Sequence, residues 1–362
     1  MGQPSVGLKP GPISYASLIH SYAECGMFDK AEDLLKQMRD MGINPNAGTY
    51  NGLIFAYGMH CRYDDMNRLF NNMKRWVCSP DDRTYSGMIV AYAKAGLFRR
   101  MERMCREMDR NGWKPSFATI NAIIQAYAKH GLVEQMQASY MCVKDYRVLI
   151  SRTSIRAMAS VYIERCKFYQ LRVLVSDVGL KRNNVGNLLW NLLLLSFGAN
   201  FQMKNLDRSF REMKDACFAP DITTFNIRAL SFARMNMLWE LHSTVIQMHH
   251  AQVLPDLVTF GAIVDAYINL KLRFRSMFEE LDVLHMKGFS PSIATDPLVF
   301  KAFGKGDFHS SSEMLMKLNP KPYGEDWTYG LLLSFYLKKR GARRIEQNPD
   351  NRGVVTKKFI VS

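Results

Sequence analysis

The stretch that decides the fold is residues 49–81, which read TYNGLIFAYGMHCRYDDMNRLFNNMKRWVCSPD. Apolar residues recur at three- and four-residue steps from Tyr50 to Tyr57, which is typical of a helix with one buried stripe. Pro80 closes the unit, because proline cannot continue a helix. Corresponding stretches elsewhere place a glycine suited to a helix C-cap before a second amphipathic segment, as Gly96 does before residues 98–108. Each unit therefore predicts a helical hairpin.

The unit recurs every 35 residues without an insertion from about residue 10 to residue 256. One column of this repeat is aromatic in all eight copies, an outcome with a chance on the order of 10⁻⁸ at this aromatic content. Three further columns are mostly aromatic or β-branched, mostly proline, and mostly methionine. The aromatic column comprises Tyr22, Tyr57, Tyr92, Tyr127, Tyr162, Phe197, Phe232 and Tyr267. The second column comprises Tyr15, Tyr50, Tyr85, Ile120, Ile155, Trp190, Phe225 and Phe260.

A single hairpin of this size cannot bury its own apolar faces, so neighbouring hairpins must stack and bury them jointly. The sequence predicts an all-α solenoid of about nine 35-residue helix-turn-helix repeats, with the aromatic and methionine columns as its core. Residues 1–11 read as the tail of a truncated repeat, residues 12–292 as eight repeats, and residues 293–340 as a degenerate repeat with a capping helix. The ninth repeat departs from the pattern, because Asp296 stands where the aromatic residue belongs and Pro297 follows it. Residues 341–362 are expected to form a basic, loosely ordered tail.

Composition excludes several classes of protein. The chain has 362 residues, 48% of them hydrophobic, which is ample material for a core and unlike a disordered chain. No apolar run approaches the roughly 18–20 residues of a membrane span. The seven cysteines are odd in number and form no CxxC pair, which favours free thiols in a reducing compartment. The net charge of +15 favours a polyanionic partner, although by itself it indicates only non-specific attraction.

No catalytic constellation, metal-ligand spacing or phosphate-binding loop stands out in the sequence, so we expect neither an enzyme nor a resident cofactor or metal. Helical repeat arrays instead bind along a groove, and in one class each repeat contacts a single RNA base through two or three side chains.

The 35-residue period, the Tyr-Ala-Lys-x-Gly segment and the closing Pro-Asp resemble the pentatricopeptide repeat family. The best matches are residues 49–81, 84–115 and 224–256, and the resemblance extends over about residues 1–340. It implies a right-handed superhelical solenoid of the plant P-type class. No deaminase signature or acidic nuclease cluster follows the array, in keeping with that class.

The resemblance also implies which side chains read bases. The residue after the first aromatic of a repeat meets the base edge, and the last residue of that repeat is its partner. Asn51 with Asp81, Asn191 with Asp221 and Asn226 with Asp256 match the family's uridine pair. Asn121 with Ser151 resembles a pyrimidine pair, Ser86 with Ser116 a purine pair, and Ala16 with Asn46 an adenosine pair. The alternative is helix-end chemistry, since Asp81, Asp221 and Asp256 are also plausible caps.

Further contacts follow from the same resemblance. The apolar residues three positions before the base-reading position would sandwich bases, namely Ile13, Leu188 and Val258. Basic residues near the ends of first helices would meet phosphates, namely Lys94, Lys129, Arg234, Lys305 and Lys338. Interface packing is the alternative for the first set, and a favourable helix-dipole contact is the alternative for the second.

The expected function is therefore sequence-specific binding of single-stranded RNA, one base per repeat, at a short, U-rich site. Such binding would serve splicing, stabilisation or translation of organelle transcripts, without catalysis and without a membrane, alone or with other RNA-processing proteins. The chloroplast is favoured over the mitochondrion, although this chain shows no transit peptide. The alternative function is a protein–protein scaffold of the helical-repeat type, favoured by the degenerate repeats and the many methionines.

Overall fold

A computed structural model describes residues 11–75, 78–145, 150–180, 185–270, 290–320, 322 and 326–347. The helices of this described part are α1 (Pro12–Glu24), α2 (Phe28–Asp40), α3 (Ala47–Met59), α4 (Tyr63–Arg75), α5 (Asp82–Ala95), α6 (Phe98–Arg110), α7 (Phe117–Lys129), α8 (Val133–Asp145), α9 (Arg152–Glu164), α10 (Phe168–Val178), α11 (Leu188–Ala199), α12 (Met203–Asp215), α13 (Ile222–Arg234), α14 (Leu238–His250), α15 (Leu257–Asn269), α17 (Pro297–Phe303), α18 (Asp307–Leu318) and α19 (Tyr329–Gln347). Within these ranges no β-strand occurs, so the all-α prediction is confirmed there. The chain divides into two compact units, residues 1–161 and 162–362.

In the first unit the helical hairpins stack in chain order. Each first helix packs against its own second helix and against the next first helix, so α1, α3, α5 and α7 form a row. Six of the eight residues of the predicted aromatic column are buried, and Tyr22 and Phe197 are partly buried. Tyr57 stacks on Phe28 of the preceding repeat with ring centroids 4.4 Å apart. Tyr127 stacks in the same way on Phe98, at 5.2 Å. The columns are therefore core, as the sequence predicts.

In the hairpins whose turns lie among the described residues, one fixed place holds a left-handed residue. Gly96 caps α5 with φ 71°. The same repeat position has φ 61° at Cys61 and φ 57° at Phe201. A left-handed φ suits glycine and costs other residues energy. These turns therefore keep one conformation because stacking imposes it, even where the residue disfavours it.

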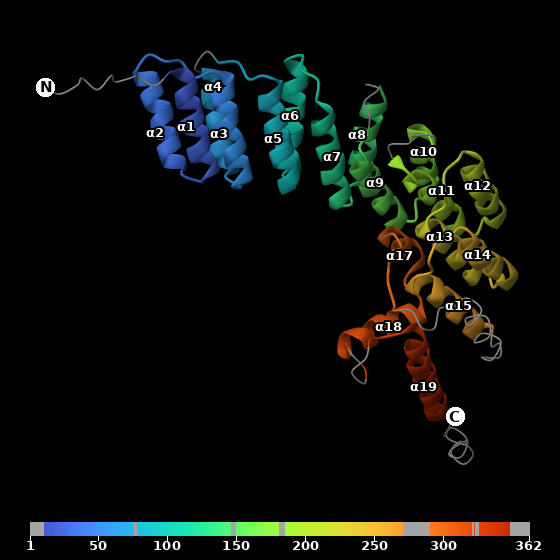
Figure 1. The fold of residues 1–362 in the computed structure, drawn as a ribbon. Coiled ribbons are helices and arrows are strands. Elements are labelled where there is room, and N and C mark those ends of the chain that lie inside the picture. The colour runs from blue at the N-terminus through green and yellow to red at the C-terminus, as the bar shows by residue number, and fades with distance from the viewer. Residues whose placement is uncertain are drawn as a thin grey trace. The chain divides into compact units, whose positions relative to one another are not determined.

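In the second unit, α11, α13 and α15 form a row, with α12 and α14 as the second helices of their hairpins. The row then changes. The second helix expected for the eighth repeat falls within residues 271–289, outside the described residues. The next described contact of α15 is with α18, whereas α17 contacts α11 and α13 (Figure 1).

The sequence places a degenerate ninth repeat at the end of the array. In the structure, α17 at the start of this segment does not pack against α15 as the next first helix would. The aromatic side chain that Phe260 would meet in a ninth first helix is missing, since Asp296 stands there. Phe260 instead contacts Phe308 of α18 and Tyr329 of α19, with ring centroids 5.3 Å and 4.8 Å away. Asp296 becomes the N-cap of α17, accepting a hydrogen bond from the backbone N–H of Leu298.

Helical structure extends past residue 341, where the sequence predicts a loosely ordered tail. Helix α19 continues through residues 341–347, because helix-favouring residues such as Arg343 and Arg344 follow Gly341. Residues 348–362, and residues 1–10 of the expected N-terminal repeat tail, lie outside the described residues.

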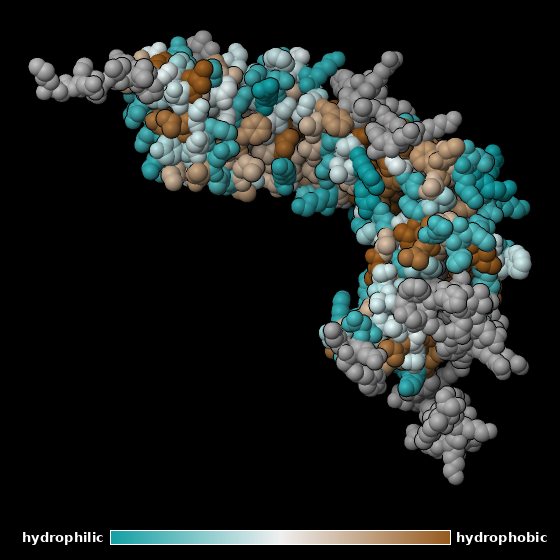
Figure 2. Space-filling view, viewed as in Figure 1, coloured by the Kyte–Doolittle hydropathy of each residue, from teal (hydrophilic) through white to brown (hydrophobic). Residues whose placement is uncertain are grey.

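Among the described residues, no helix has the length and apolar character to cross a membrane. On the face in view in Figure 2, hydrophilic residues are interspersed with scattered hydrophobic ones.

Candidate nucleic-acid interface

The best-defined polar arrangement lies where α3 meets α5. The Asn51 amide donates from Nδ2 to Asp81 Oδ1 at 3.1 Å. The Thr84 hydroxyl lies 2.7 Å from Asn51 Oδ1 and 2.8 Å from Asp81 Oδ1. Asp81 also accepts from the Thr84 backbone N–H at 2.8 Å, which completes a capping box at the start of α5. One carboxylate therefore caps the first helix of the next repeat and orients the asparagine of its own repeat.

The same three-residue arrangement recurs twice in the second unit. Asn191 donates to Asp221 at 3.2 Å and accepts from Thr224 at 2.7 Å. Asn226 donates to Asp256 at 2.8 Å and accepts from Thr259 at 2.6 Å. Each of these aspartates thus caps a helix and also accepts a hydrogen bond from its asparagine. The two interpretations are compatible, because one carboxylate makes both contacts.

This arrangement leaves part of Asn51 available. The Asn51 Nδ2 carries two hydrogens and donates one to Asp81, and its Oδ1 has a second lone pair beside the one that meets Thr84. An amide fixed in this way presents one donor and one acceptor, which suits the alternating donor and acceptor atoms of a uracil edge.

Hydrogen bonds from neighbouring residues keep the Asp81 carboxylate ionised. Burial would raise the pKa of this carboxyl, but hydrogen bonds from Thr84 and Asn51 outweigh burial and hold the pKa below its ordinary value. Asp81 is consequently an anion at neutral pH that acts only as a hydrogen-bond acceptor.

The other predicted base-reading residues lack this network. Asn121 is turned differently: its Oδ1 accepts from the backbone N–H of Ser151 at 3.0 Å, and its Nδ2 donates to the Phe117 carbonyl at 2.7 Å. Serine has no carboxylate to accept from the amide, which explains the difference. Asn46 and Ser116 are N-caps of α3 and α7. Ala16 and Ser86 are partly exposed on α1 and α5.

The predicted sandwiching residues differ in exposure. Ile13 is 83% exposed, whereas Leu188 and Val258 are buried. Among the predicted phosphate contacts, Lys94, Lys129 and Lys338 are exposed. The other two are engaged: Arg234 donates to the Phe303 carbonyl at 2.6 Å, and Lys305 pairs with Glu313 at 2.6 Å.

Sequence reasoning missed the threonines Thr84, Thr224 and Thr259. Their signal was present, because each stands three residues after its aspartate, the spacing of a capping box. In the part of the chain that the structure describes, no group of three or more His, Cys, Asp or Glu side chains could hold a metal ion.

Models of the PPR repeat family match residues 10–59 and 45–94, and a model of the PPR repeat matches residues 83–113 and 118–141. Residues 10–113 and 118–141 thus match pentatricopeptide repeats. The matched residues contain α1 to α7, and the Asn–Asp–Thr arrangement of their second and third hairpins recurs beyond them at Asn191 and Asn226.

One curated relative of this chain is the chloroplastic pentatricopeptide repeat-containing protein At4g14190 of Arabidopsis thaliana. The two are 30% identical over 187 residues, 50% of this chain and 37% of the relative. The chain thus spans little more than a third of that protein's length.

Solved structures with a similar fold include PPR10 in complex with an 18-nt psaJ RNA element. It is 17% identical, with a TM-score of 0.46, over 85% of this chain and 50% of PPR10. PPR10 from maize gives 20% identity and a TM-score of 0.35 over 94% of this chain and 58% of PPR10. Yeast Rmd9p in complex with a 16-nt target RNA is 10% identical, with a TM-score of 0.34, over 85% of this chain and 77% of Rmd9p.

Proposed function

We propose that this chain is a pentatricopeptide repeat protein that binds single-stranded RNA along its first helices, one base per repeat, without catalysis. The observation that carries the proposal is the Asn–Asp–Thr arrangement. It occurs at three places that share one position in the repeat, and at Asn51 it leaves one donor and one acceptor for a base edge. A cap serving only the helix would need the aspartate and the threonine but not the asparagine.

The proposed site is short and U-containing. From the side-chain pairs, the protein order corresponds to an RNA sequence, from 5′ to 3′, of an undefined base, uridine, a purine, a pyrimidine, an undefined base and two uridines. Lys94 and Lys129, both exposed and one repeat apart at the ends of α5 and α7, would contact phosphates. RNA in complex with PPR10 and Rmd9p supports nucleic acid as the partner class.

The proposed biological role is P-type: occupying organelle transcripts so that they are spliced, stabilised or translated. The chloroplast is the proposed compartment, and the chloroplastic relative from Arabidopsis thaliana supports it. Sequencing the RNA that copurifies with the protein from chloroplasts would identify the transcript.

The direct test measures binding of the strand AUACAUU and of its variant with cytidine at the second base. We expect wild-type protein to prefer uridine there by about tenfold, in the range of one good bidentate contact. Asn51→Ala should lose that preference. Asn71→Ala changes the same residue type at an exposed place on α4 and should keep it.

If wild-type protein binds neither strand at low salt, the proposal that the protein binds RNA is wrong, and the alternative function as a protein–protein scaffold is favoured. If Asn51→Ala and Asn71→Ala discriminate equally well, RNA is bound but Asn51 does not read a base. Far-ultraviolet circular dichroism on both variants confirms that each retains its helices.

A further inference from the structure

We propose that residues 292–303, the cover segment, dock on the base-reading residues of the repeats 187–221 and 222–256 and compete there with RNA. The cover segment comprises the expected start of the ninth repeat, Ser292 to Asp296, followed by α17. This inference rests on the proposed function and concerns two of its three uridine-reading pairs.

The first observation is a set of hydrogen bonds at the third pair. Asn226 donates both amide hydrogens, one to Asp256 and the other to the Thr295 hydroxyl at 2.6 Å. Asp256 Oδ2 accepts from the Thr295 hydroxyl at 2.7 Å and from the backbone N–H groups of Ala294 and Thr295, both at 3.1 Å. Thr295 therefore uses the donor that Asn51 leaves available to a base.

The side chains of Asn226 and Asp256 are buried beneath the residues that make these hydrogen bonds. Asn226 is 0% exposed and Asp256 1%, whereas the equivalent Asn51 is 7% exposed and Asp81 is only partly buried. A base cannot reach Asn226 while Thr295 lies on it.

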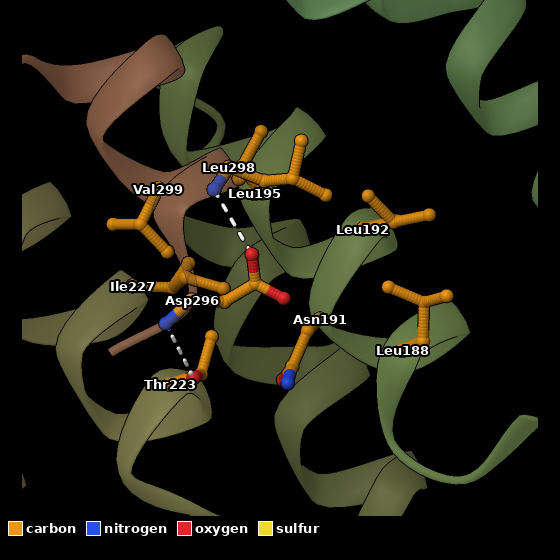
Figure 3. Close-up of a pocket in the computed structure, with 9 residues that line it drawn as sticks. All are labelled: Leu188, Asn191, Leu192, Leu195, Thr223, Ile227, Asp296, Leu298 and Val299. Carbon is orange, nitrogen blue, oxygen red and sulfur yellow. Dashed lines mark hydrogen bonds between the residues drawn. The ribbon is translucent and has the colours of Figure 1, made fainter. Parts of the chain in front are cut away.

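The second observation concerns the neighbouring pair. Leu298 and Val299 of α17 pack against α11 and α13 beside Asn191, and Asp296 donates its backbone N–H to the Thr223 hydroxyl at 3.0 Å (Figure 3). The cavity left between these residues has a volume of about 10 Å³, room for about one water molecule. Leu188, the predicted sandwiching residue of this repeat, lines the same cavity.

Both ends of the cover segment are fastened to the same unit. The Ser292 carbonyl accepts from the Leu257 N–H at 2.9 Å. At the other end Arg234, a predicted phosphate contact, donates to the Phe303 carbonyl, and Lys301 forms an ion pair with Glu164. The cover segment thus engages base-reading, base-sandwiching and phosphate-contact residues together, which are the groups that RNA would need.

The short length of α17 explains how this arrangement arises. Seven residues are too few for a first helix, and Asp296 and Pro297 remove the aromatic residue that would keep α17 in the row. Most helix stability comes from packing an apolar face. Leu298 and Val299 obtain that packing on α11 and α13.

The test compares the strands AUACAUU and AUACACC, which differ only at the bases assigned to the two covered pairs. Leu298→Ser with Val299→Ser should release the cover segment, and Thr295→Val should remove its hydroxyl bonds while keeping the apolar packing. Ile293→Ser is the control, since Ile293 belongs to the same segment but is 47% exposed.

For wild-type protein, and likewise for Ile293→Ser, the affinities for the two strands should agree within about twofold, because the covered pairs do not contact the RNA. The released double variant should bind AUACAUU about tenfold tighter than wild type does, since the binding-competent fraction rises. Thr295→Val should change affinity in the same direction by a smaller factor.

Equal affinities of wild type and both variants for AUACAUU, with the Asn51-dependent preference intact, would overturn competition by the cover segment and leave the proposed function standing. The absence of RNA binding in every variant would overturn the proposed function and this inference with it.

Discussion

At the scale of single residues, the threonine that follows each aspartate decides how the asparagine is held. The Thr84 hydroxyl meets Asn51 Oδ1 and Asp81 Oδ1, and accepts from the Asp81 backbone N–H at 3.2 Å. For Asn121 the corresponding residue is Ser154, three residues after Ser151. The Ser154 hydroxyl accepts from the Ser151 hydroxyl at 2.9 Å and meets the backbone carbonyl of Asn121, not its amide side chain. The Asn121 amide is turned to the backbone of Phe117. A threonine that bridges asparagine and aspartate therefore distinguishes an oriented amide from one that bonds its own helix.

We predict that Thr84→Val destabilises the protein by about 1–3 kcal/mol, because a buried acceptor and a buried donor lose their partner. The uridine preference at the second base should fall as well, since Asn51 is no longer fixed. Chemical unfolding and RNA binding measure the two effects. Thr119→Val, at the same repeat position in α7, is the matched control and should leave the preference unchanged. A loss of preference with both variants would contradict the bridging role of Thr84.

At the scale of elements, the sequence predicted the hairpins well because their periodic apolar residues have one solution, stacking in register. It also marked the ninth repeat as damaged from Asp296 and Pro297. It could not place that repeat, because the destination of α17 depends on which neighbouring faces remain unpaired. Phe260 meets Phe308 and Tyr329 from helices outside the expected order. Such long-range pairings leave no periodic trace in the sequence.

The same rearrangement positions a half-buried acid, Asp265, against the start of α18. The Asp265 carboxylate in α15 accepts hydrogen bonds from the backbone N–H groups of Asp307 and Phe308, at 2.9 Å and 3.1 Å. Burial raises the pKa of Asp265 to about 6, with the charge of Asp307 adding to the effect and the two hydrogen bonds opposing it.

We therefore predict that Asp265 makes the second unit less stable as the pH rises. A pKa raised on folding means that the stabilising contribution is full below the unfolded value near 3.8 and is lost as the pH passes about 6. The loss is at most about 3 kcal/mol. In denaturant unfolding from pH 4 to pH 7, Asp265→Asn should lack this loss, so its stability relative to wild type should rise with pH. Asp215→Asn, at an exposed position on α12, should show no such trend. A constant difference between Asp265→Asn and wild type would contradict the prediction.

At the scale of the whole molecule, the positive charge is concentrated near the C-terminus. Residues 338–362 hold eight Lys and Arg against two Asp and Glu, so they contribute +6 of the net +15. The repeats carry the remainder over a much longer chain. Specific phosphate contacts, rather than a general positive field, would then have to position RNA on the first helices. The exposed residues Lys94 and Lys129 recur at the repeat spacing, as such contacts should.

We predict that replacing Lys94 and Lys129 together by alanine weakens RNA binding most at low salt. Each phosphate contact to a single strand contributes about −0.7 to the slope of log K against log salt concentration. The double variant should therefore lower the magnitude of that slope by about 1.4, and its uridine preference should be unchanged, because phosphates carry no sequence information. Fluorescence anisotropy over a salt series measures both. Lys36→Ala with Lys204→Ala, on the second helices α2 and α12, removes the same charge and should keep the slope. If both double variants change the slope equally, the first helices hold no preferred phosphate track and RNA is attracted by net charge alone.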